Sequence, residues 1–402
     1  MNHTDPSEGF APLQGYRILD FSSNIAGPWA TMILAQLGAD VIKVEPPHGD
    51  DARAWAMQPD GQGLVHRQVN VGKRGIVLDL KASDGIEIAG RLIESSHVLL
   101  QSMRPGVAER VGIGRADVEN RNPEILYYDL SGFGAGPVGQ GMPGYDPLVQ
   151  AFSGIVAMNG YEGVPPVRCA PSLIDFGTGQ WIATGILAAL MSGARGHSVR
   201  HMETALIDTA FSVVPYQAID AKLSGKRPPK AGSGNPVAAP YQCFRASDGE
   251  LMIAAPSQRL WEKLLQAIGA DNLLTDPRFE TVQSRTRHLA DLETALNNEL
   301  GREPVAYWVN RLSKAGIPAA EVSGLEHSVT GPIAAERDTF LENASAPLVR
   351  LPWMVDGAPV PWRRPAPALG EHGPEILREL RYDDTEIATL TTPGGAAAAR
   401  HD

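Results

Sequence analysis

The chain has 402 residues, 43% of them hydrophobic and 20% charged, which is the composition of an ordinary folded protein long enough for two domains. Its formal net charge of −11 disfavours nucleic acid as a partner, and its two cysteines, Cys169 and Cys243, lack the spacing of a metal site or of a disulfide framework. We expect a cytoplasmic protein without membrane contact, because no uninterrupted apolar run approaches about 18 residues and residues 1–15 lack the basic and apolar regions of a signal peptide.

The first part of the chain alternates predicted strands and helices. A strand over residues 16–21 is followed by a helix that Pro28 opens and Gly38 ends, and then by a strand over residues 40–45. A strand–helix–strand unit makes its strands parallel, so this segment predicts an α/β fold with a Rossmann-like sheet. The alternation continues with strands over 76–80, 98–101 and 125–130 and with a helix over 85–94. Residues 201–206 and the segment to Leu223 complete this first part.

The composition changes at residues 224–236, a linker rich in proline, glycine and basic residues. Beyond it, strands over 241–245 and 251–255 flank Asp248-Gly249, which is a hairpin signal, and helices are predicted over 258–268, 289–300 and 304–314. We therefore expect a large domain that begins with residues 1–224, a smaller α+β domain over 225–324, and a segment, 325–402, that returns to the large domain. That last segment is rich in proline and arginine, carries a helix over 373–380 and is not expected to build a core alone.

Gly134, Gly136 and Gly139 follow a predicted strand with the spacing of a dinucleotide-binding fingerprint. That fingerprint must open a helix, because the helix N-terminus holds the pyrophosphate. Pro137 and Pro143 forbid an immediate helix here, and the first strand–helix turn lacks the glycine pattern. We therefore exclude NAD as a cofactor. The sequence also lacks a GxSxG nucleophile elbow, a P-loop and an HExxH metal motif, so we expect no metal and no redox cofactor.

Basic residues gather where predicted strands end or in the loops that follow, at Lys73, Arg74, Arg104 and Arg110. In an α/β sheet, the loops at the carboxyl ends of the strands build the ligand crevice. A cluster of cations there suits a phosphate-rich ligand. Solvated surface charge is the alternative interpretation for each of these residues.

Residues 171–190 combine a carboxylate, Asp175, with the small residues Gly177, Thr178 and Gly179 and with an apolar run of helical spacing. We expect a loop of small residues that leads into a buried helix and places Asp175 at the helix N-terminus. The free N–H groups and the helix dipole there would favour an ionised carboxylate. The alternative is that Asp175 only caps the helix. The apolar run consists of Trp181, Ile182, Ile186, Leu187 and Leu190.

An ordered set of blocks over about residues 15–390 resembles the class III CoA-transferases, the family of formyl-CoA transferase, carnitine CoA-transferase and the bile-acid-operon enzymes. The blocks are LDFSSNIAGPWATMILAQLGADVIKVEPPHGDDAR, KRGIVLDLK, RPGVAERVGIG, NPEILYYDLSGFGAGP, GYDPLVQAFSG, APYQCFRASDGE, DPRF and KAGIP. The resemblance implies a Rossmann-like large domain made from both chain ends, a small central domain and a homodimer of two interlocked rings. It also implies that coenzyme A or acyl-CoA is a substrate and that no cofactor is permanently bound.

By this resemblance, Asp175 matches the family's nucleophilic aspartate. In the family mechanism, the aspartate attacks an acyl-CoA thioester, forms an acyl-aspartyl anhydride and releases the CoA thiolate. The thiolate returns to give an aspartyl-CoA thioester, from which an acceptor acid takes the CoA by the same steps in reverse. Covalent catalysis of this kind splits one difficult acyl transfer into easier steps.

Other family positions fall on three groups of residues. A glycine loop that shields the intermediate matches Gly232, Ser233, Gly234 and Asn235, and its glycines would let backbone N–H groups approach an oxyanion. A flexible linker is the alternative interpretation of this loop. Tyr145 and Asp146 match positions beside the acyl group, and core packing is the alternative interpretation of Tyr145. Residues that match CoA ligands or lie among them are Asn24, Ile25, Ala26, Lys73, Arg74, Ser102, Met103, Arg104 and Arg110.

These residues favour a homodimeric CoA-transferase that moves CoA from an acyl-CoA to a carboxylic acid. Ile25 and Ser131 stand where formyl-CoA transferases have glutamine and lysine, which counts against formyl-CoA and oxalate as substrates. The alternatives are the α-methylacyl-CoA racemase branch of the same fold and a non-catalytic CoA-binding subunit. Racemases place a histidine where this chain has Tyr145, and a phenol, with an ordinary pKa of about 10, is a poor base near neutral pH.

Overall fold

The computed structural model of the chain describes residues 9–342 and 346–399, and its internal contacts divide the chain into two compact units. Unit 1 comprises Met1–Ser153, Ala170–Pro215 and Ala335–Asp402, and unit 2 comprises Gly154–Cys169 and Tyr216–Ala334. The described residues near both chain ends therefore belong to unit 1. The bounds differ from those expected because residues 154–169, 216–224 and 325–334 also belong to unit 2. Residues 1–8 of the stretch used to exclude a signal peptide lie outside the described residues.

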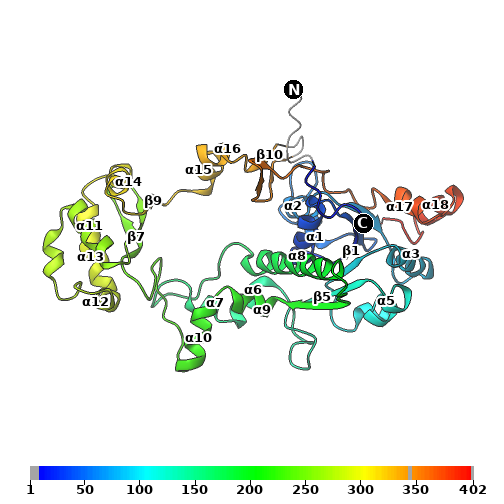
Figure 1. Ribbon diagram of the computed structural model, residues 1–402, viewed down its shortest axis with the longest axis horizontal. Helices are drawn as coiled ribbons and strands as arrows, with labels where there is room; N and C mark the ends of the chain where they lie inside the picture. Colours follow the sequence, from blue (N-terminus) through cyan, green and yellow to red (C-terminus); the bar gives the residue numbers. More distant parts are fainter. Residues whose placement is uncertain (1–8, 343–345, 400–402) are drawn as a thin grey trace. The chain divides into compact units, whose positions relative to one another are not determined.

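Unit 1 is built on a six-stranded sheet in which every neighbouring pair of strands is parallel (Figure 1). The strand order is β3–β2–β1–β4–β5–β6, the order of a Rossmann-type nucleotide-binding sheet. This confirms the predicted α/β fold with a parallel central sheet. The strands are β1 (Arg17–Phe21), β2 (Asp40–Glu45), β3 (Arg74–Val77), β4 (Val98–Gln101), β5 (Leu126–Ser131) and β6 (His201–Ala205).

Helices of unit 1 pack on both faces of this sheet. They are α1 (Ala26–Gln36), the 3₁₀ turn η1 (Asp51–Ala54), α2 (Leu64–Asn70), α3 (Ser83–Glu94), α4 (Val107–Arg110), α5 (Arg115–Arg121), α6 (Asp146–Phe152), α8 (Leu173–Gly193), α9 (Leu206–Ser212), α17 (Gly373–Glu379) and α18 (Asp384–Thr391). Successive side chains of a strand point to opposite faces. Leu19 and Phe21 of β1 belong to a core cluster with residues of α3, α5, α17 and α18, whereas Asp20 points to the other face and accepts a hydrogen bond from Thr31 of α1.

The C-terminal segment of unit 1 packs against the first strands of the chain. Figure 1 shows α17 and α18 beside α3. Arg74 of β3 forms ion pairs with Glu375 (2.8 Å) and Glu379 (2.6 Å), and the N–H of Asp79 donates to the carbonyl of Ala396. The segment also contains two small antiparallel hairpins, β10 (Phe340–Leu341) with β11 (Leu348–Val349) and β12 (Met354–Val355) with β13 (Ala358–Pro359).

Helix α8 packs along α1 and begins earlier than the sequence predicts. It starts at Leu173, so the expected loop through Gly177 and Gly179 is wrong and Asp175 lies inside the first helical turn. The small residues instead allow close helix packing, because a Cβ at Gly179 would lie 2.5 Å from the carbonyl oxygen of Ala26. Across the same contact, the rings of Trp29 and Phe176 meet edge to face with centroids 5.1 Å apart.

The burial of α8 also differs in part from the prediction. By length and composition alone the helix is apolar enough to cross a membrane, a test that core helices of folded proteins also pass. Ile182 and Ile186 are buried in unit 1, as in a core helix, but Trp181 of the predicted apolar run is 54% exposed. The helix is apolar on nearly all sides, so its sequence does not reveal which side faces the core.

Unit 2 combines a three-stranded antiparallel sheet, in the order β7–β8–β9, with a set of helices. The hairpin predicted at Asp248-Gly249 is confirmed, because it joins β7 to β8. Trp261, Phe279 and Trp308 are among the side chains of its own core. The elements are α7 (Ile155–Met158), α10 (Pro215–Ser224), β7 (Tyr241–Arg245), β8 (Glu250–Ala254), α11 (Gln258–Ile268), η2 (Asp271–Thr275), α12 (Val282–Arg287), α13 (Leu289–Leu300), α14 (Val305–Lys314), β9 (Ala319–Glu321), α15 (Leu325–Thr330) and α16 (Pro332–Glu336).

Candidate active site

Asp175 lines a cavity of about 290 Å³ in unit 1, here called cavity 1. Its walls come from the segments that follow five parallel strands, β1, β2, β4, β5 and β6, and from the first turn of α8. The carboxyl edge of a parallel sheet is where ligands bind in open α/β folds. Lining residues from the predicted set are Asn24, Ile25, Ala26, Ser102, Met103, Arg104, Tyr145 and Asp175.

A second carboxylate, Asp146, caps the helix that carries Asp175. The Asp146 side chain is 2% exposed, and its Oδ2 accepts hydrogen bonds from the backbone N–H groups of Ile174 (2.8 Å) and Asp175 (3.2 Å). Gln150 donates to its other oxygen at 2.6 Å. The capping role that was the alternative interpretation of Asp175 therefore belongs to Asp146, and no hydrogen bond holds the Asp175 carboxylate among the described residues.

Burial, and after it the negative charge of Asp146, raises the pKa of Asp175 to about 7. This is opposite to the expectation that the helix N-terminus favours the ionised carboxylate. Water is removed from the carboxylate by its surroundings, and the same N–H groups that would stabilise it are used by Asp146. Near neutral pH, Asp175 is therefore poised between its two protonation states, a property typical of catalytic groups.

The loop between β5 and α6 supplies much of the wall opposite α1. As predicted from its prolines, the glycine-rich segment forms no helix before Asp146. Gly132 and Gly144 pack so closely that a Cβ at Gly132 would lie 2.3 Å from the Cα of Gly144. Tyr145, directly after this contact, is 48% exposed and lines cavity 1, so the core-packing interpretation does not fit its position.

A second cavity of about 690 Å³, cavity 2, adjoins cavity 1. It lies beside the ends of β2 and β3 and includes the proline-containing segment after β2. Four residues line both cavities, which makes them neighbours: Ser23, Asp51, Ser102 and Met103. An extended ligand lying across this shared wall would reach Asp175 at one end.

The four basic residues singled out in the sequence have different positions. Arg104 is exposed and lines cavity 1, and its side chain forms no hydrogen bond or ion pair within the described ranges. Arg110 ends α4 as an exposed side chain and is not among the residues that line cavity 1 or cavity 2.

Lys73 and Arg74 are instead buried and paired. The Lys73 ammonium lies 2.8 Å from Asp20 with both side chains 0% exposed, and Arg74 bridges Asp40 to Glu375 and Glu379. Neither offers a free charge to a phosphate, so their placement differs from the predicted CoA-binding role. Long side chains from an apparent surface loop reach inward here because carboxylates distant in sequence are available to them.

The glycine loop of residues 232–235 belongs to unit 2 and is ordered by its own hydrogen bonds. Gly232 has a positive φ of 58°, and its N–H donates to the carbonyl of Gly160 at 2.9 Å. The Ser233 hydroxyl accepts from the N–H of Cys243, and the N–H of Asn235 donates to the carbonyl of Tyr241. These contacts describe a formed loop within unit 2, and its predicted role over the intermediate stays a prediction.

Sequence reasoning missed several residues of cavity 1. Asp51 and Trp55 come from the segment around η1, and Phe133, Gln140 and Met142 come from the glycine-rich loop. The glycine spacing after β5 was a usable signal, because glycines next to a strand end mark a close approach of the backbone. Among the described residues, no group of three or more histidine, cysteine, aspartate or glutamate side chains is placed to hold a metal ion.

Comparison with known proteins gives consistent matches over most of the chain. The sequence model of CoA-transferase family III matches residues 13–373. The acetyl-CoA:oxalate CoA-transferase of Acetobacter aceti is 33% identical over 384 residues, covering 94% of this chain and 98% of that protein. The succinate–glutarate CoA-transferase of Agrobacterium fabrum is 30% identical, with the same coverage. A crystal structure of a CAIB/BAIF family protein from Brucella suis superposes with a TM-score of 0.82 at 30% identity, covering 92% of this chain and 99% of that one.

Proposed function

The chain belongs to CoA-transferase family III, and we propose that it moves CoA from an acyl-CoA donor to a carboxylic acid through covalent intermediates on Asp175. The observation that supports this best is the Asp175 carboxylate in cavity 1, which has no hydrogen-bond partner of its own within the described ranges because Asp146 takes over the helix cap. A nucleophile needs a free, positioned oxygen, and this arrangement provides one.

The proposed steps conserve atoms and charge. An Asp175 oxygen attacks the thioester carbon of the donor, the C–S bond breaks, and CoA leaves as a thiolate with the electron pair. The thiolate attacks the aspartyl carbon of the anhydride, and the donor acid leaves as a carboxylate. The acceptor carboxylate then attacks the aspartyl-CoA thioester, and the released thiolate attacks the acceptor carbonyl, which frees Asp175. No step needs a proton from the protein.

The remaining parts of the proposal are the loop, the assembly and the location. We place residues 232–235 over the intermediate as a shield against water, and we propose an interlocked homodimer in the cytoplasm. An α-methylacyl-CoA racemase is the second candidate on this fold, and a non-catalytic CoA-binding subunit is the third. Tyr145 in place of a histidine argues against the racemase, and Asp175 in an open cavity argues against an inactive subunit.

Mass spectrometry of the purified protein tests this function. A panel of short acyl-CoA donors is incubated with mixtures of carboxylic acids, including oxalate, succinate and glutarate, which appear in the names of relatives. New acyl-CoA products without any added subunit would support the proposal. Exchange of the α-hydrogen of 2-methylacyl-CoA in D₂O without an acceptor acid would identify a racemase, and absence of both reactions would leave only a binding role.

The pH profile of transfer should report the protonation of Asp175. Only the ionised carboxylate attacks, so activity should rise as pH rises through the pKa of about 7. We expect kcat/KM, which reports the free enzyme, to increase about tenfold between pH 6 and pH 8. Asp146→Asn keeps an acceptor for the helix cap but removes the negative charge, so the inflection should move to lower pH. Asp208→Asn, in the first turn of α9, is the control and should leave the inflection in place, and a profile that is flat over this range would contradict the proposal.

Among the described residues that line cavity 1, Arg104 is the one with a cationic side chain, and it suits an acid that carries a second carboxylate. We expect Arg104→Gln to raise the KM for a dicarboxylic acceptor about tenfold, and the KM for a monocarboxylic acceptor much less. Arg110→Gln is the matched comparison, since its predicted role is toward CoA phosphates. An effect of Arg104→Gln that is confined to the KM of the acyl-CoA would instead support the predicted role of Arg104 in CoA binding.

A further inference from the structure

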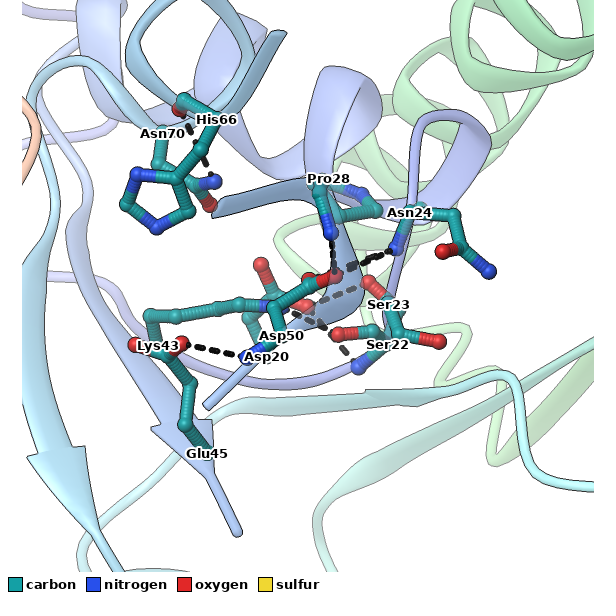
Figure 2. Close-up of polar contacts among 12 residues, drawn as sticks. Asp20, Ser22, Ser23, Asn24, Pro28, Lys43, Glu45, Asp50, His66 and Asn70 are labelled. Atoms are coloured by element: carbon teal, nitrogen blue, oxygen red, sulfur yellow. Dashed lines mark hydrogen bonds and ion pairs between the residues drawn. The ribbon is translucent and has the colours of Figure 1, made fainter. Parts of the chain in front are cut away.

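Two fully buried ion pairs lie next to the turn that follows β1. Figure 2 labels three of their four residues, Asp20, Lys43 and Asp50. We call Asp20, Lys43, Asp50 and Lys73 the buried charge cluster. The Lys73 ammonium is 2.8 Å from Asp20, the Lys43 ammonium is 3.1 Å from Asp50, and all four side chains are 0–1% exposed. A third pair, Arg53 with Glu45, adjoins them at 2.6 Å. The Arg53 side chain is 24% exposed, so this third pair lies at the edge of the buried charge cluster.

Packing alone does not require these charges. Transfer of ions from water into a protein interior is costly, and replacement of a buried pair by apolar residues of similar size is often neutral or stabilising. Burial would by itself lower the pKa of Lys43, but Asp20 and Asp50 outweigh burial and raise it. Lys43 in turn lowers the pKa of Asp50 in spite of its burial. The pair stays ionised, so each partner keeps a full charge for hydrogen bonding.

The cluster holds main-chain groups of residues 22–24, here called turn 22–24. The N–H of Ser22 donates to Asp20 Oδ1 at 3.0 Å, and the ammonium of Lys43 donates to the carbonyl oxygen of Ser22. The N–H of Ser23 donates to the hydroxyl of Ser102, at 3.0 Å. Side chains therefore form the hydrogen bonds to these backbone N–H and carbonyl groups that other backbone groups would form in a helix or a strand.

Asn24 completes this arrangement. Its φ of 66° lies in the left-handed region, which non-glycine residues rarely adopt. Its N–H donates to the Asp50 carboxylate, 3.1 Å from Oδ1 and 3.2 Å from Oδ2. Figure 2 shows the Asn24 amide pointing away from the cluster while its backbone N–H points toward Asp50. The turn is thus fixed at one end by Lys43 and at the other by Asp50, which are paired with each other.

Turn 22–24 forms part of the wall between the two cavities, because Asn24 lines cavity 1, Ser22 lines cavity 2 and Ser23 lines both. We propose that Lys43 and Asp50 are positioning residues that fix this turn in the shape that binds an acyl-CoA lying across both cavities. Both residues also line cavity 2, but their side chains are only 1% exposed, so they act through the turn. The inference rests on the proposed function, which supplies the ligand.

Asp50→Asn and Lys43→Met test this inference by kinetics and by calorimetric binding of CoA. In Asp50→Asn, the amide N–H₂ would oppose the Lys43 ammonium, so the turn loses one anchor. Lys43→Met removes the donor to the Ser22 carbonyl. Each variant should raise both the KM for acyl-CoA and the Kd for CoA about tenfold, the size expected for a lost charged hydrogen bond. The kcat should stay within about threefold, because contacts kept through the transition state affect KM alone.

Asp40→Asn is the matched control. Asp40 begins the same strand, β2, and is paired with Arg17 and Arg74 at its far end, and it lines neither cavity. This variant should leave KM and Kd unchanged even if it lowers thermal stability. Equal changes in KM for Asp40→Asn and Asp50→Asn, or changes in melting temperature alone, would overturn the inference.

The double variant Lys43→Met/Asp50→Asn covers the case in which a single unpaired charge prevents folding. It removes both charges and should fold, yet Ser22 still lacks its donor. A wild-type Kd for CoA in the folded double variant would overturn the inference. A wild-type protein that binds CoA but transfers it to no acid would refute the proposed function and leave the binding comparison valid, so the two failures are distinguishable.

Discussion

Replacement of Asp175 by asparagine is expected to lower the kcat of CoA transfer at least about 10³-fold, because an amide at this position cannot form the anhydride. The Asp175 side chain accepts no hydrogen bond within the described ranges, so the isosteric change should leave α8 and its Asp146 cap intact. The measurement is single-turnover transfer by mass spectrometry. In the wild type, hydroxylamine added with acyl-CoA should trap a hydroxamate on the peptide that contains Asp175.

The same variant makes a prediction about stability. A carboxyl group whose pKa is higher in the folded state than in the unfolded state binds more protons when folded, so stability falls as pH rises between the two values. For Asp175 this window runs from its ordinary value of 3.8 to about 7. Asp175→Asn removes this pH-dependent loss of stability, so the variant should be at least as stable as the wild type at pH 8. Asp208→Asn should retain activity, and an active Asp175→Asn enzyme would exclude the covalent mechanism.

Lys73→Met is expected to lower the free energy of unfolding by about 3–5 kcal/mol, the usual cost of removing one partner from a buried ion pair. Lys73 donates to Asp20, to the carbonyl of Pro28 and to Asn70, at 2.8, 2.9 and 2.8 Å. The variant leaves all three acceptors buried without this donor. Urea unfolding followed by circular dichroism at neutral pH measures the effect.

Two further variants serve as controls for the effect of Lys73→Met on stability. Arg17→Met removes partly exposed ion pairs with Asp40 and Glu379 and should cost about 1 kcal/mol or less. The double variant Asp20→Asn/Lys73→Met removes both buried charges and should recover part of the stability. A Lys73→Met protein of wild-type stability with a raised KM for acyl-CoA would restore the interpretation of Lys73 as a surface phosphate ligand.

Helices and strands long enough to show a repeating pattern of apolar residues were predictable from the sequence. The bounds of β2, β4, β7, α11 and α13 agree with the predicted ranges. Helices of four to seven residues, such as α2, α4, α6 and α9, were not predicted, because so few residues do not complete enough turns to show a period. Which of their residues are buried is determined by the sheet on which they pack and not by a local pattern.

The candidate site was predictable to the extent that it is local. Asp175 and the turns after β1 and β4 were identified from the resemblance, and the structure places them around one cavity. The pairing of Lys73 with Asp20 spans 53 residues, and the capping of α8 by Asp146 spans 28. A local sequence pattern cannot contain two residues so far apart. A lysine in a predicted loop is therefore interpreted as a surface charge until its buried partner is known. The wrong start of α8 has a related cause, because glycines that suggest a loop serve here for contact with α1.

The C-terminal segment has a consequence for the order in which the nascent chain folds. The core cluster on one face of the large sheet joins side chains of β1 to Ile376, Leu377, Ile387 and Leu390, whereas the core of unit 2 is complete by Ala319. During synthesis, unit 2 can therefore complete its core before the ribosome has made α17 and α18, which cover the sheet of unit 1. Until then, the apolar residues of that face stay open to solvent, a state that favours aggregation and chaperone binding. Loss of the last thirty or so residues would leave this face without its cover however complete the active-site residues were.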